Sequence, residues 1–290
     1  MEAIKAIGLT KSYGKSRGII DVDLSVEKGD FFGFIGPNGA GKSTTIRTLL
    51  GLISPTSGTA EIFGRDITGH RTEILSGVGY LPSEAAFYNG MRVGDILKLS
   101  ADLHKKDCSD EAKKLCDRLQ LDTKRKIEQL SLGNRKKVGI VCAMQHKPDL
   151  YIMDEPTSGL DPLIQREFYN LLKERSNEGA TVFLSSHVLS EVQRYCRHAA
   201  VIREGRLLVC DSVEKLGSAE AKRVVLRGVN EIRLPGIKNL QQLDNGISFL
   251  YSGKADVLLK TLASMPVTDV TISEPDLEEI FMHFYEKEDN

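Results

Sequence analysis

The strongest constraint on the fold of this chain is a glycine-rich run that ends in Lys and Ser. Residues 36–43 match the pattern G-x-x-x-x-G-K-[ST], which holds phosphate when a β-strand precedes it and an α-helix follows it. An apolar run, residues 31–35, lies directly before the motif, and helix-like sequence over residues 44–50 follows it. We therefore predict a strand, a phosphate-binding loop and a helix in succession. The loop consists of Gly36, Pro37, Asn38, Gly39, Ala40, Gly41, Lys42 and Ser43.

The residue types of this loop suit a nucleotide and its metal ion. Glycines let the backbone wrap closely around a phosphate chain with its N–H groups pointing inward. The start of the following helix, at Lys42, Ser43 and Thr44, adds the positive end of the helix dipole. Lys42 is predicted to reach the β- and γ-phosphates, and the Ser43 hydroxyl is predicted to hold Mg²⁺. We expect every residue in the range 36–44 to contact the nucleotide.

A second apolar run ends in two adjacent carboxylates. Residues 150–153 are predicted to form a buried strand, and Asp154 and Glu155 follow it directly. This position places both side chains at the rim of the sheet, where the phosphates are expected to lie. Asp154 suits the Mg²⁺ shell, and Glu155 suits general-base activation of a water aimed at the γ-phosphate. Such a pair is often a solvated turn, but beside a phosphate loop it indicates nucleotide hydrolysis.

The pattern along the chain predicts an α/β protein with two parts. Over residues 1–216, short apolar runs alternate with helical stretches, which favours βαβ units around a mostly parallel sheet. A polar, helical segment at about residues 93–147 is predicted to be an inserted helical subdomain. Residues 217–290 are predicted to form a small C-terminal α+β appendage. The expected strands are 181–184 in the first part and 223–226, 231–234, 247–251 and 267–272 in the appendage, whose expected helices are 255–263 and 275–286.

Composition places the chain among ordinary globular proteins and excludes several functional classes. It has 290 residues, of which 41% are hydrophobic and 27% charged, and its formal net charge is -1. A near-neutral charge argues against a dedicated nucleic-acid-binding protein. No apolar run approaches the roughly 20 residues of a membrane span, and the N-terminus has no apolar core of a signal peptide. The 5 cysteines form no Cys-x-x-Cys pair, so we expect free thiols in a reducing compartment and no zinc site.

Four further motifs occur in order along the first 215 residues and carry a family resemblance. Together with the phosphate loop and the carboxylate strand, they make the chain resemble the nucleotide-binding subunit of an ABC transporter. The resemblance implies the P-loop NTPase fold of ABC ATPases, with its inserted helical subdomain. The additional motifs are Lys11-Ser12-Tyr13-Gly14, Leu130-Ser131-Leu132-Gly133-Asn134, Ser158-Gly159-Leu160-Asp161 and Leu184-Ser185-Ser186-His187.

The resemblance implies a nucleotide contact for residues in three of these motifs. Tyr13 would stack on adenine, although a lone Tyr near a strand also fits plain packing. Ser131, Gly133 and Asn134 lie where a helix is expected to begin, and the helix start would face the γ-phosphate of an ATP bound to a partner subunit. Asp161 would lie at the same dimer interface. These four residues are therefore expected to bind ATP across the dimer.

The resemblance also implies a catalytic set, cofactors and partners. His187 would donate a hydrogen bond to the γ-phosphate or to the attacking water, whereas an isolated His is more commonly a surface residue. It would act with Lys42 and Glu155 in the hydrolysis of ATP, with Mg²⁺ as the metal. Two subunits, either two copies of this chain or this chain and a homologue, would enclose two ATP molecules and drive a separate integral-membrane permease. The chain would then lie on the cytoplasmic side of the cell membrane, attached through the permease.

Three positions depart from the family pattern. Ser83 stands where family members commonly have Gln, and it is too short to span the same distance. Its Mg²⁺ contact would therefore run through a water molecule or pass to Glu84. In the motif at the helix start, Leu132 replaces a Gly and Asn134 replaces a Gln, while the residues nearest the phosphate are retained. We therefore expect hydrolysis to be retained.

The C-terminal part of the chain indicates which branch of the family the chain resembles. Residues 275–281 resemble the corresponding part of exporters of antibiotics, lantibiotics, toxin peptides or lipid-linked polymers, so we expect export of such a substrate. Two other classes stay open: an ABC protein acting on ribosomes or DNA, and a nucleotide-binding regulator that never turns over. The single cassette without heptads argues against the first, and the intact carboxylates argue against the second. The last predicted helix has an apolar face made of Leu277, Ile280, Phe281 and Phe284.

Overall fold

The computed structural model describes residues 1–14, 16–217 and 222–273, and the chain divides into two compact units. The first unit is Met1–Asp211 and the second is Ser212–Asn290, so the division comes slightly before the boundary expected after Leu216. Each unit has its own buried apolar cluster. The helix expected over residues 275–286 lies outside the described residues.

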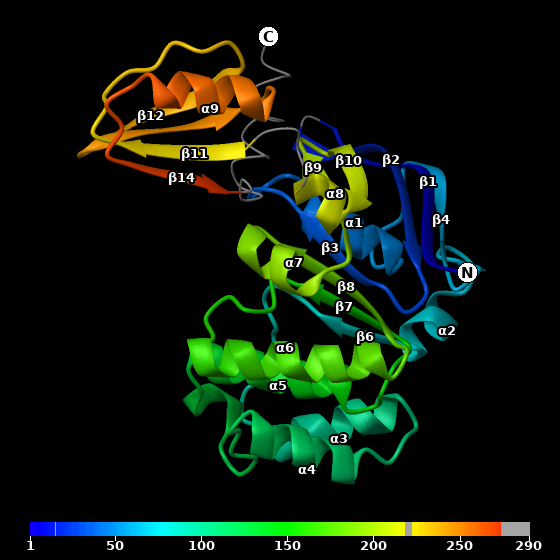
Figure 1. Cartoon of the computed structure of the whole chain (residues 1–290). Helices are drawn as coiled ribbons and strands as arrows, with labels where there is room; N and C mark the ends of the chain where they lie inside the picture. The colour runs from blue at the N-terminus through cyan, green and yellow to red at the C-terminus, as the bar shows by residue number, and fades with distance from the viewer. Residues whose placement is uncertain (15, 218–221, 274–290) are drawn as a thin grey trace. The chain divides into compact units, whose positions relative to one another are not determined.

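A six-stranded sheet forms the centre of the first unit (Figure 1). Its strands are β3 (Phe31–Ile35), β6 (Val78–Leu81), β7 (Leu150–Asp154), β8 (Thr181–Ser186), β9 (His198–Arg203) and β10 (Arg206–Ser212). They lie in the order β10-β9-β3-β8-β7-β6, and the pairs from β9 through to β6 are parallel, as the alternation of strands and helices predicted. Strands β3, β7 and β8 are buried at every position, which is typical of a parallel sheet covered on both faces.

A second sheet in the first unit was not predicted. Its strands are β1 (Glu2–Tyr13), β2 (Ser16–Glu27), β4 (Ser57–Ile62) and β5 (Arg65–Asp66). They lie in the order β2-β1-β4-β5 with antiparallel pairing throughout. Several register shifts interrupt the pairing of β1 with β2. Because such shifts break the regular alternation of buried and exposed residues, the sequence gives only a weak strand signal here.

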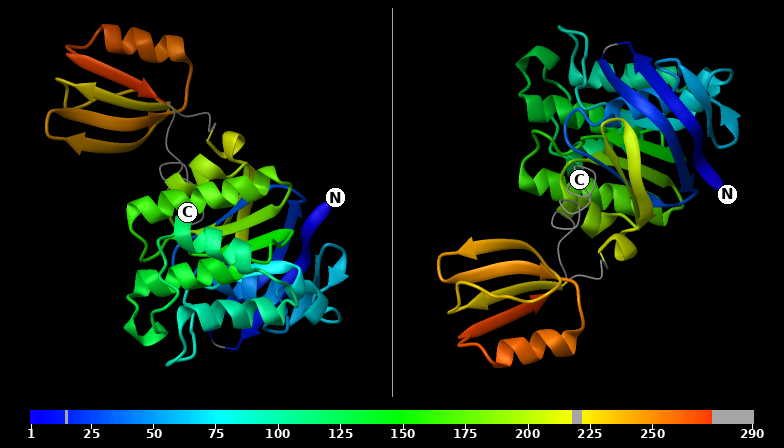
Figure 2. Two further views of the ribbon diagram at one scale, coloured as in Figure 1. Left: turned by 90° about the horizontal axis from the view of Figure 1, so that it is seen from below. Right: turned by 90° about the horizontal axis from the view of Figure 1, so that it is seen from above.

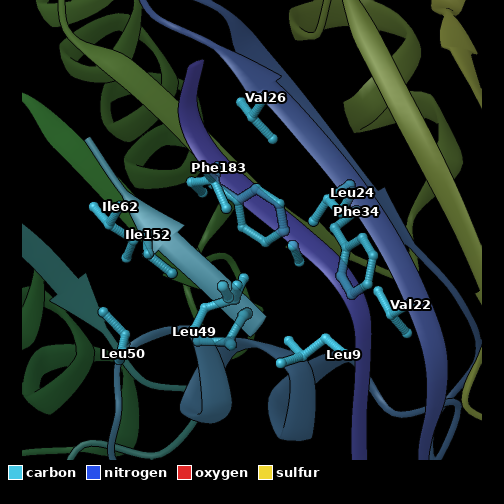
Figure 3. Packing of buried hydrophobic residues seen from close by; sticks show 14 of the residues in the cluster. Leu9, Val22, Leu24, Val26, Phe34, Leu49, Leu50, Ile62, Ile152 and Phe183 are labelled. Atoms are coloured by element: carbon cyan, nitrogen blue, oxygen red, sulfur yellow. The ribbon is translucent and has the colours of Figure 1, made fainter. Parts of the chain in front are cut away.

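The main apolar cluster lies between these two sheets (Figure 3). Helix α1 (Lys42–Leu49) packs there, and the side chains of Ile46 and Leu49 are fully buried. Phe34 of β3 and Phe183 of β8 pack with their ring centres 5.3 Å apart in the same cluster. Because α1 contacts strands of both sheets, its first turn is fixed relative to the end of β3.

The remaining helices of the first unit pack either on the six-stranded sheet or on one another. They are α2 (Arg71–Ser76), α3 (Val93–Leu103), α4 (Ser109–Arg118), the 3-10 helix η1 (Ile127–Gln129), α5 (Leu132–Met144), α6 (Pro162–Asn177) and α7 (Leu189–Tyr195). Helix α5 packs on β6, α6 packs on β8, and α7 packs on β3 and β8, while α3 and α4 pack on α5. The expected helical segment at residues 93–147 thus contains η1 and the helices α3, α4 and α5, which are labelled in Figure 1.

The second unit contains a four-stranded antiparallel sheet with a helix packed on it (Figure 2). Its described elements are α8 (Val213–Gly217), β11 (Lys222–Arg227), β12 (Ile237–Leu243), β13 (Gly246–Tyr251), α9 (Ala255–Ala263) and β14 (Asp269–Ser273). The strand order is β12-β13-β11-β14. Leu258 of α9 joins Val224 and Phe249 in the apolar cluster of this unit. The predicted helix over residues 255–263 is confirmed.

The strand expected over residues 231–234 is wrong. That segment has no regular structure, although Ile232 is buried in the apolar cluster and Leu234 packs against it. Strand β12 begins only after Pro235, which lacks an N–H for pairing, and Gly236, which has a φ of 91°. The alternating apolar residues therefore reflect packing on the core and not sheet pairing.

The cysteines differ in their exposure to solvent. All are free thiols; Cys108, Cys116 and Cys196 are buried, Cys142 is partly buried and Cys210 is exposed. Burial raises the pKa of the Cys116 thiol to about 11. Among the helices of the described residues, none combines the length and the apolar character needed to cross a membrane.

Candidate functional site

A cavity of about 380 Å³ lies at the predicted phosphate loop, between the end of β3 and the start of α1. Glu155, directly after β7, and Ser83, in the loop after β6, contribute to the same cavity. Gly36 and Ala40 of the predicted loop are buried and are not among its lining residues. The carboxyl ends of three strands of one sheet thus meet here. The lining residues are Gly18, Pro37, Asn38, Gly39, Gly41, Lys42, Ser43, Thr44, Ser83 and Glu155.

The backbone of the loop requires glycine at particular positions. Gly39 and Gly41 have φ values of 81° and 109°, which L side chains rarely adopt. A Cβ atom on Gly36 would lie 2.4 Å from the carbonyl oxygen of Ile202. The glycine spacing of the sequence motif therefore corresponds to a tight curve that larger residues would disrupt.

The Lys42 ammonium is buried inside the curve of the loop. It donates hydrogen bonds to the carbonyl oxygens of Gly36, at 2.6 Å, and Pro37, at 3.2 Å. It also lies 3.1 Å from a carboxylate oxygen of Glu155, and its side chain is only 6% exposed. A buried ammonium needs such partners because it has lost its hydration. The ion pair connects the phosphate loop to the residue that follows β7.

Glu155 is held by contacts of both its backbone and its side chain. Its φ of 48° lies in the left-handed region, and its N–H donates to the carbonyl and hydroxyl oxygens of Ser185, both at 3.2 Å. One carboxylate oxygen lies 2.7 Å from Nδ1 of His187, and the other pairs with Lys42. Strained backbone conformations of this kind are concentrated at functional sites. Glu155 therefore contacts both other residues of the predicted catalytic set, Lys42 and His187.

Asp154 is fully buried and has one carboxylate oxygen without a partner. Its Oδ1 accepts a hydrogen bond of 2.6 Å from the Ser185 hydroxyl, whereas Oδ2 has no hydrogen-bond partner in the described part of the chain. A buried carboxylate oxygen is unfavourable unless a donor or cation meets it. Burial, together with the negative charge of Asp154, raises the pKa of Tyr80 on β6. The site thus offers a carboxylate oxygen, and Ser43 offers a hydroxyl, which are ligand types that Mg²⁺ accepts.

The loop after β6 is held by a lysine that the sequence did not single out. Lys136 of α5 donates hydrogen bonds to the carbonyl oxygens of Ser83, at 2.7 Å, and Pro82, at 3.4 Å. This lysine is 5% exposed; burial lowers its pKa, and the charges of nearby carboxylates, Asp154 first among them, act in the opposite direction. Sequence reasoning missed Lys136 because its role depends on α5 lying along β6.

The residues predicted to face a partner subunit lie at the starts of two helices. The Ser131 hydroxyl caps α5 and accepts from the N–H of Asn134 at 3.4 Å, and the Asp161 carboxylate caps α6. A Cβ atom on Gly133 would lie 2.5 Å from the carbonyl oxygen of Gly159, so the two motifs pack closely together. Neither motif is among the described residues that line the cavity at the phosphate loop.

Tyr13 and His187 also lie outside the lining of that cavity, as far as the described residues show. Tyr13 is exposed at the end of β1, and the Lys11 ammonium lies 5.4 Å from the centre of its ring. His187 is 50% exposed and reaches the cavity only through the carboxylate that it contacts. Sequence reasoning missed Gly18, which lines the cavity and belongs to no motif. It also missed the role of Ser185, which binds both carboxylate residues, because the motif that contains Ser185 was assigned a role only at His187.

Comparison with known sequences gives a consistent result. A family described as ABC transporter matches residues 19–158. The bacitracin transport ATP-binding protein BcrA of Bacillus licheniformis is 37% identical, and the alignment covers 96% of this chain and 96% of that protein. The linearmycin resistance ATP-binding protein LnrL of Bacillus subtilis (strain 168) is 28% identical, with 97% of each chain covered. The similarity to these relatives therefore extends over both units.

Solved structures agree in fold. The structure of an ATP-binding subunit of an ABC transporter matches with a TM-score of 0.70 and 29% identity, covering 74% of this chain and 92% of that chain. The dimeric structure of a post-hydrolysis ATP-binding cassette bound to ADP and Pi matches with a TM-score of 0.65 and 21% identity, covering 72% and 98%. At that lower identity the likeness concerns the fold alone. The predicted α/β fold of the P-loop type is confirmed.

Proposed function

Since the chain belongs to the ABC transporter family as an ATP-binding and ATP-hydrolysing protein, we propose that it powers a separate membrane permease from the cavity at its phosphate loop. In this proposal the backbone of residues 36–44 and the Lys42 ammonium bind the phosphates of ATP. Tyr13 stacks on the adenine ring, and Glu155 is the general base for the attacking water.

The observation that carries the proposal is the contact of Glu155 with both Lys42 and His187. The two distances are 3.1 and 2.7 Å, and the Lys42 ammonium and the His187 ring flank one carboxylate beside the loop that would hold the γ-phosphate. A carboxylate in that place can accept a proton from a water molecule as the water attacks phosphorus. His187 can orient the carboxylate or donate to the phosphate itself. This arrangement favours hydrolysis over simple nucleotide binding.

The contacts of Lys42 suggest how ATP prepares the site. In the described structure the ammonium donates to the carbonyl oxygens of Gly36 and Pro37 and pairs with Glu155. Phosphate oxygens carry more negative charge than carbonyl oxygens and form stronger hydrogen bonds with an ammonium. Incoming phosphates therefore draw Lys42 away from its present partners. Glu155 is then free to accept a proton, and His187 keeps its carboxylate oriented.

We propose that Ser43 and Asp154 contribute to a Mg²⁺ site. The unpartnered Oδ2 of Asp154 supports this role, since a cation would satisfy it. Within the described residues, no group of three or more His, Cys, Asp or Glu side chains could hold a metal, so phosphate oxygens and water would supply the other ligands. Mg²⁺ neutralises charge that develops on the phosphates. Either Ser83, through a water molecule, or Glu84 would add a further contact.

A second ATP-binding subunit is proposed to complete each site. Ser131, Gly133 and Asn134 at the start of α5, and Asp161 at the start of α6, would contact the nucleotide held by the partner. Leu132 is 71% exposed at the same helix start, and burial against another chain would remove this large apolar side chain from water. The permease would attach the pair of subunits to the cytoplasmic side of the cell membrane.

The permease substrate is proposed to be an antibiotic peptide or a similar drug that is exported. The support comes from two relatives, one named for bacitracin transport and the other for linearmycin resistance, both similar along nearly the whole chain. Purification of the tagged chain from detergent-solubilised cells tests whether a permease is the partner, and it identifies the protein on which the substrate must be sought. We expect a polytopic membrane protein in stoichiometric yield, and recovery of ribosomes or nucleic acid without one would contradict it.

The hydrolytic role is tested by Glu155→Gln, which keeps the shape of the side chain but removes the base. Phosphate release should fall to background, while ATP should still raise the melting temperature, because the phosphate loop is intact. The matched control is Glu61→Gln, an exposed residue on β4, which should hydrolyse ATP like the wild type. Turnover near the wild-type rate in Glu155→Gln would exclude Glu155 as the base.

A further inference from the structure

We propose that Lys136 is a positioning residue for ATP hydrolysis: it holds the Ser83 loop, defined as residues 82–84, against the nucleotide cavity and connects that loop to α5. The inference rests on the proposed function, because the cavity must bind nucleotide for the position of the loop to matter. It adds a residue that belongs to none of the motifs found in the sequence.

The contacts of Lys136 are directed at the backbone of the loop. Its ammonium donates to the carbonyl oxygens of Ser83, at 2.7 Å, and Pro82, at 3.4 Å, and its side chain is 5% exposed. Burying an ammonium is costly even when it is paired. An apolar side chain of similar length would fill the same space without that cost. The retained charge therefore favours a role at the site over simple packing.

The helix that carries Lys136 is fixed closely against β6. A Cβ atom on Gly139 would lie 2.7 Å from a methyl carbon of Leu81, and one on Gly79 would lie 2.1 Å from the carbonyl oxygen of Ala143. Lys136, Gly139 and Ala143 share one face of α5, because they are spaced three or four residues apart. This face lies along β6, and the Ser83 loop begins where β6 ends. Lys136 is thus placed to reach the loop.

The first turn of the same helix contacts the segment that follows Glu155. Gly133 lies so close to the carbonyl oxygen of Gly159 that a Cβ atom would be 2.5 Å away. Helix α5 therefore touches both this segment and, through Lys136, the Ser83 loop. Since the Ser83 side chain is short, its backbone must lie near the nucleotide for the residue to take part. The hydrogen bonds from Lys136 keep the backbone of Ser83 in that position.

The direct test replaces the ammonium with an uncharged side chain of similar length in the full chain, as Lys136→Met. In the nucleotide-free protein, hydrogen–deuterium exchange of a peptide covering residues 82–86 should become about tenfold faster, because the loop has lost its hydrogen bonds to the ammonium. The kcat for ATP should fall about tenfold, since small misplacement of groups at the phosphate has large effects on rate. Binding of ATP without Mg²⁺ should change less than about twofold, because the phosphate loop is untouched.

Two further variants separate positioning from stability. Lys136→Arg keeps the charge and its donors, and it should restore slow exchange of the loop and most of kcat. Lys137→Met removes the neighbouring buried lysine of α5, which is 8% exposed, and should leave both the exchange of residues 82–86 and kcat unchanged. The double variant with Ser83→Ala completes a mutant cycle. If Lys136 acts through the loop, Ser83→Ala should lower kcat in the wild type but have little further effect in Lys136→Met.

Three results would overturn the inference. They are unchanged exchange and kcat in Lys136→Met, equal effects of Lys137→Met, and additive effects of Lys136→Met and Ser83→Ala. Should Lys136→Met fail to fold, Lys136→Gln provides the same comparison with Lys136→Arg. If the wild-type chain itself did not hydrolyse ATP, the proposed function would fail instead, and the exchange of residues 82–86 would still show whether Lys136 holds the loop.

Discussion

At the scale of single residues, Lys42 and Glu155 depend on each other, since each is the charged partner of the other at 3.1 Å beside the cavity. Only one of the two belongs to the phosphate loop. In the proposed mechanism, this pairing would link the binding of phosphate to the release of the base. Mutation can distinguish the two proposed roles, because Lys42 would contact the nucleotide directly and Glu155 would act on water.

Lys42→Ala should weaken both ATP binding and hydrolysis, in contrast to Glu155→Gln, which should lose hydrolysis alone. The reason is the loss of a charge-assisted contact to the phosphates, which we expect to weaken ATP binding at least about tenfold. Equilibrium binding of a fluorescent ATP analogue measures this. Lys28→Ala, at the turn before β3, is the control and should bind like the wild type. Wild-type binding by Lys42→Ala would exclude the assignment of the phosphate loop.

A buried histidine should make the chain sensitive to acid. His146 stacks on His104 with ring centres 3.6 Å apart, and burial, with the neighbouring His104 second, lowers its pKa to about 4. Above pH ~6.5 the histidine is neutral in both states, so its contribution to stability is complete there. Between pH ~6.5 and 4 the unfolded chain binds a proton that the folded chain does not, so stability falls by up to about 1.4 kcal/mol per pH unit.

Urea unfolding at pH 7.5 and 5.5 measures this effect, and His146→Phe should flatten the dependence on pH. His70→Asn, which changes an exposed histidine before α2, should keep the wild-type dependence. An unchanged slope in His146→Phe would show that other groups cause the acid sensitivity.

The residues of the proposed site could be predicted from the sequence to very different degrees. Residues 36–43, Asp154 and Glu155 form short contiguous patterns whose chemistry is local, so the sequence could name them. Lys136 and Ser185 act only through neighbours on other elements: Ser185 binds the carboxylate of Asp154 across two paired strands. A contact of this kind between different elements produces no pattern in the spacing of residues along the sequence.

At the scale of elements, the connection between α4 and α6 stands out, because Arg118 bridges two helices. Its guanidinium donates to both carboxylate oxygens of Glu174, at 2.6 and 2.8 Å, and also to Glu167. The side chain of Arg118 is 34% exposed and that of Glu174 is 52% exposed, so solvent screens part of the attraction. The bridge joins the helical subdomain to a helix that packs on β8.

Arg118→Met should therefore lower the free energy of unfolding by about 1 kcal/mol at low salt, and by less in about 1 M NaCl. Chemical unfolding at two salt concentrations measures the difference. Lys124→Met, an exposed lysine of the same subdomain, should change stability little at either concentration. An effect of Arg118→Met that did not depend on salt would indicate packing of the aliphatic stem in place of the ion pairs.

Elements were predicted well where one face or both faces are continuously buried. Strand β3 and helix α9 have the predicted bounds, and β7 and β8 differ only at their ends. The sheet formed by β1, β2, β4 and β5 was missed because its register is irregular. Residues 231–234 were assigned wrongly because apolar residues that pack on a core can imitate the alternation of a strand.

At the scale of the whole molecule, the separate apolar clusters of Met1–Asp211 and Ser212–Asn290 predict two unfolding events. Calorimetry of Glu155→Gln should show two transitions, because each unit buries its own core. ATP with Mg²⁺ should raise the midpoint of only one, since a ligand stabilises the part that binds it. A single transition that moved as a whole would instead show that the units unfold together.

The distribution of cysteines offers a practical benefit. Of the free thiols, Cys210 alone is exposed, and it lies in β10 beside the junction of the units. A maleimide dye should therefore attach at this one place in the unmodified chain, while burial protects the other sulfurs. Its emission would report on changes in the surroundings of β10 during the ATPase cycle, without any engineered label site.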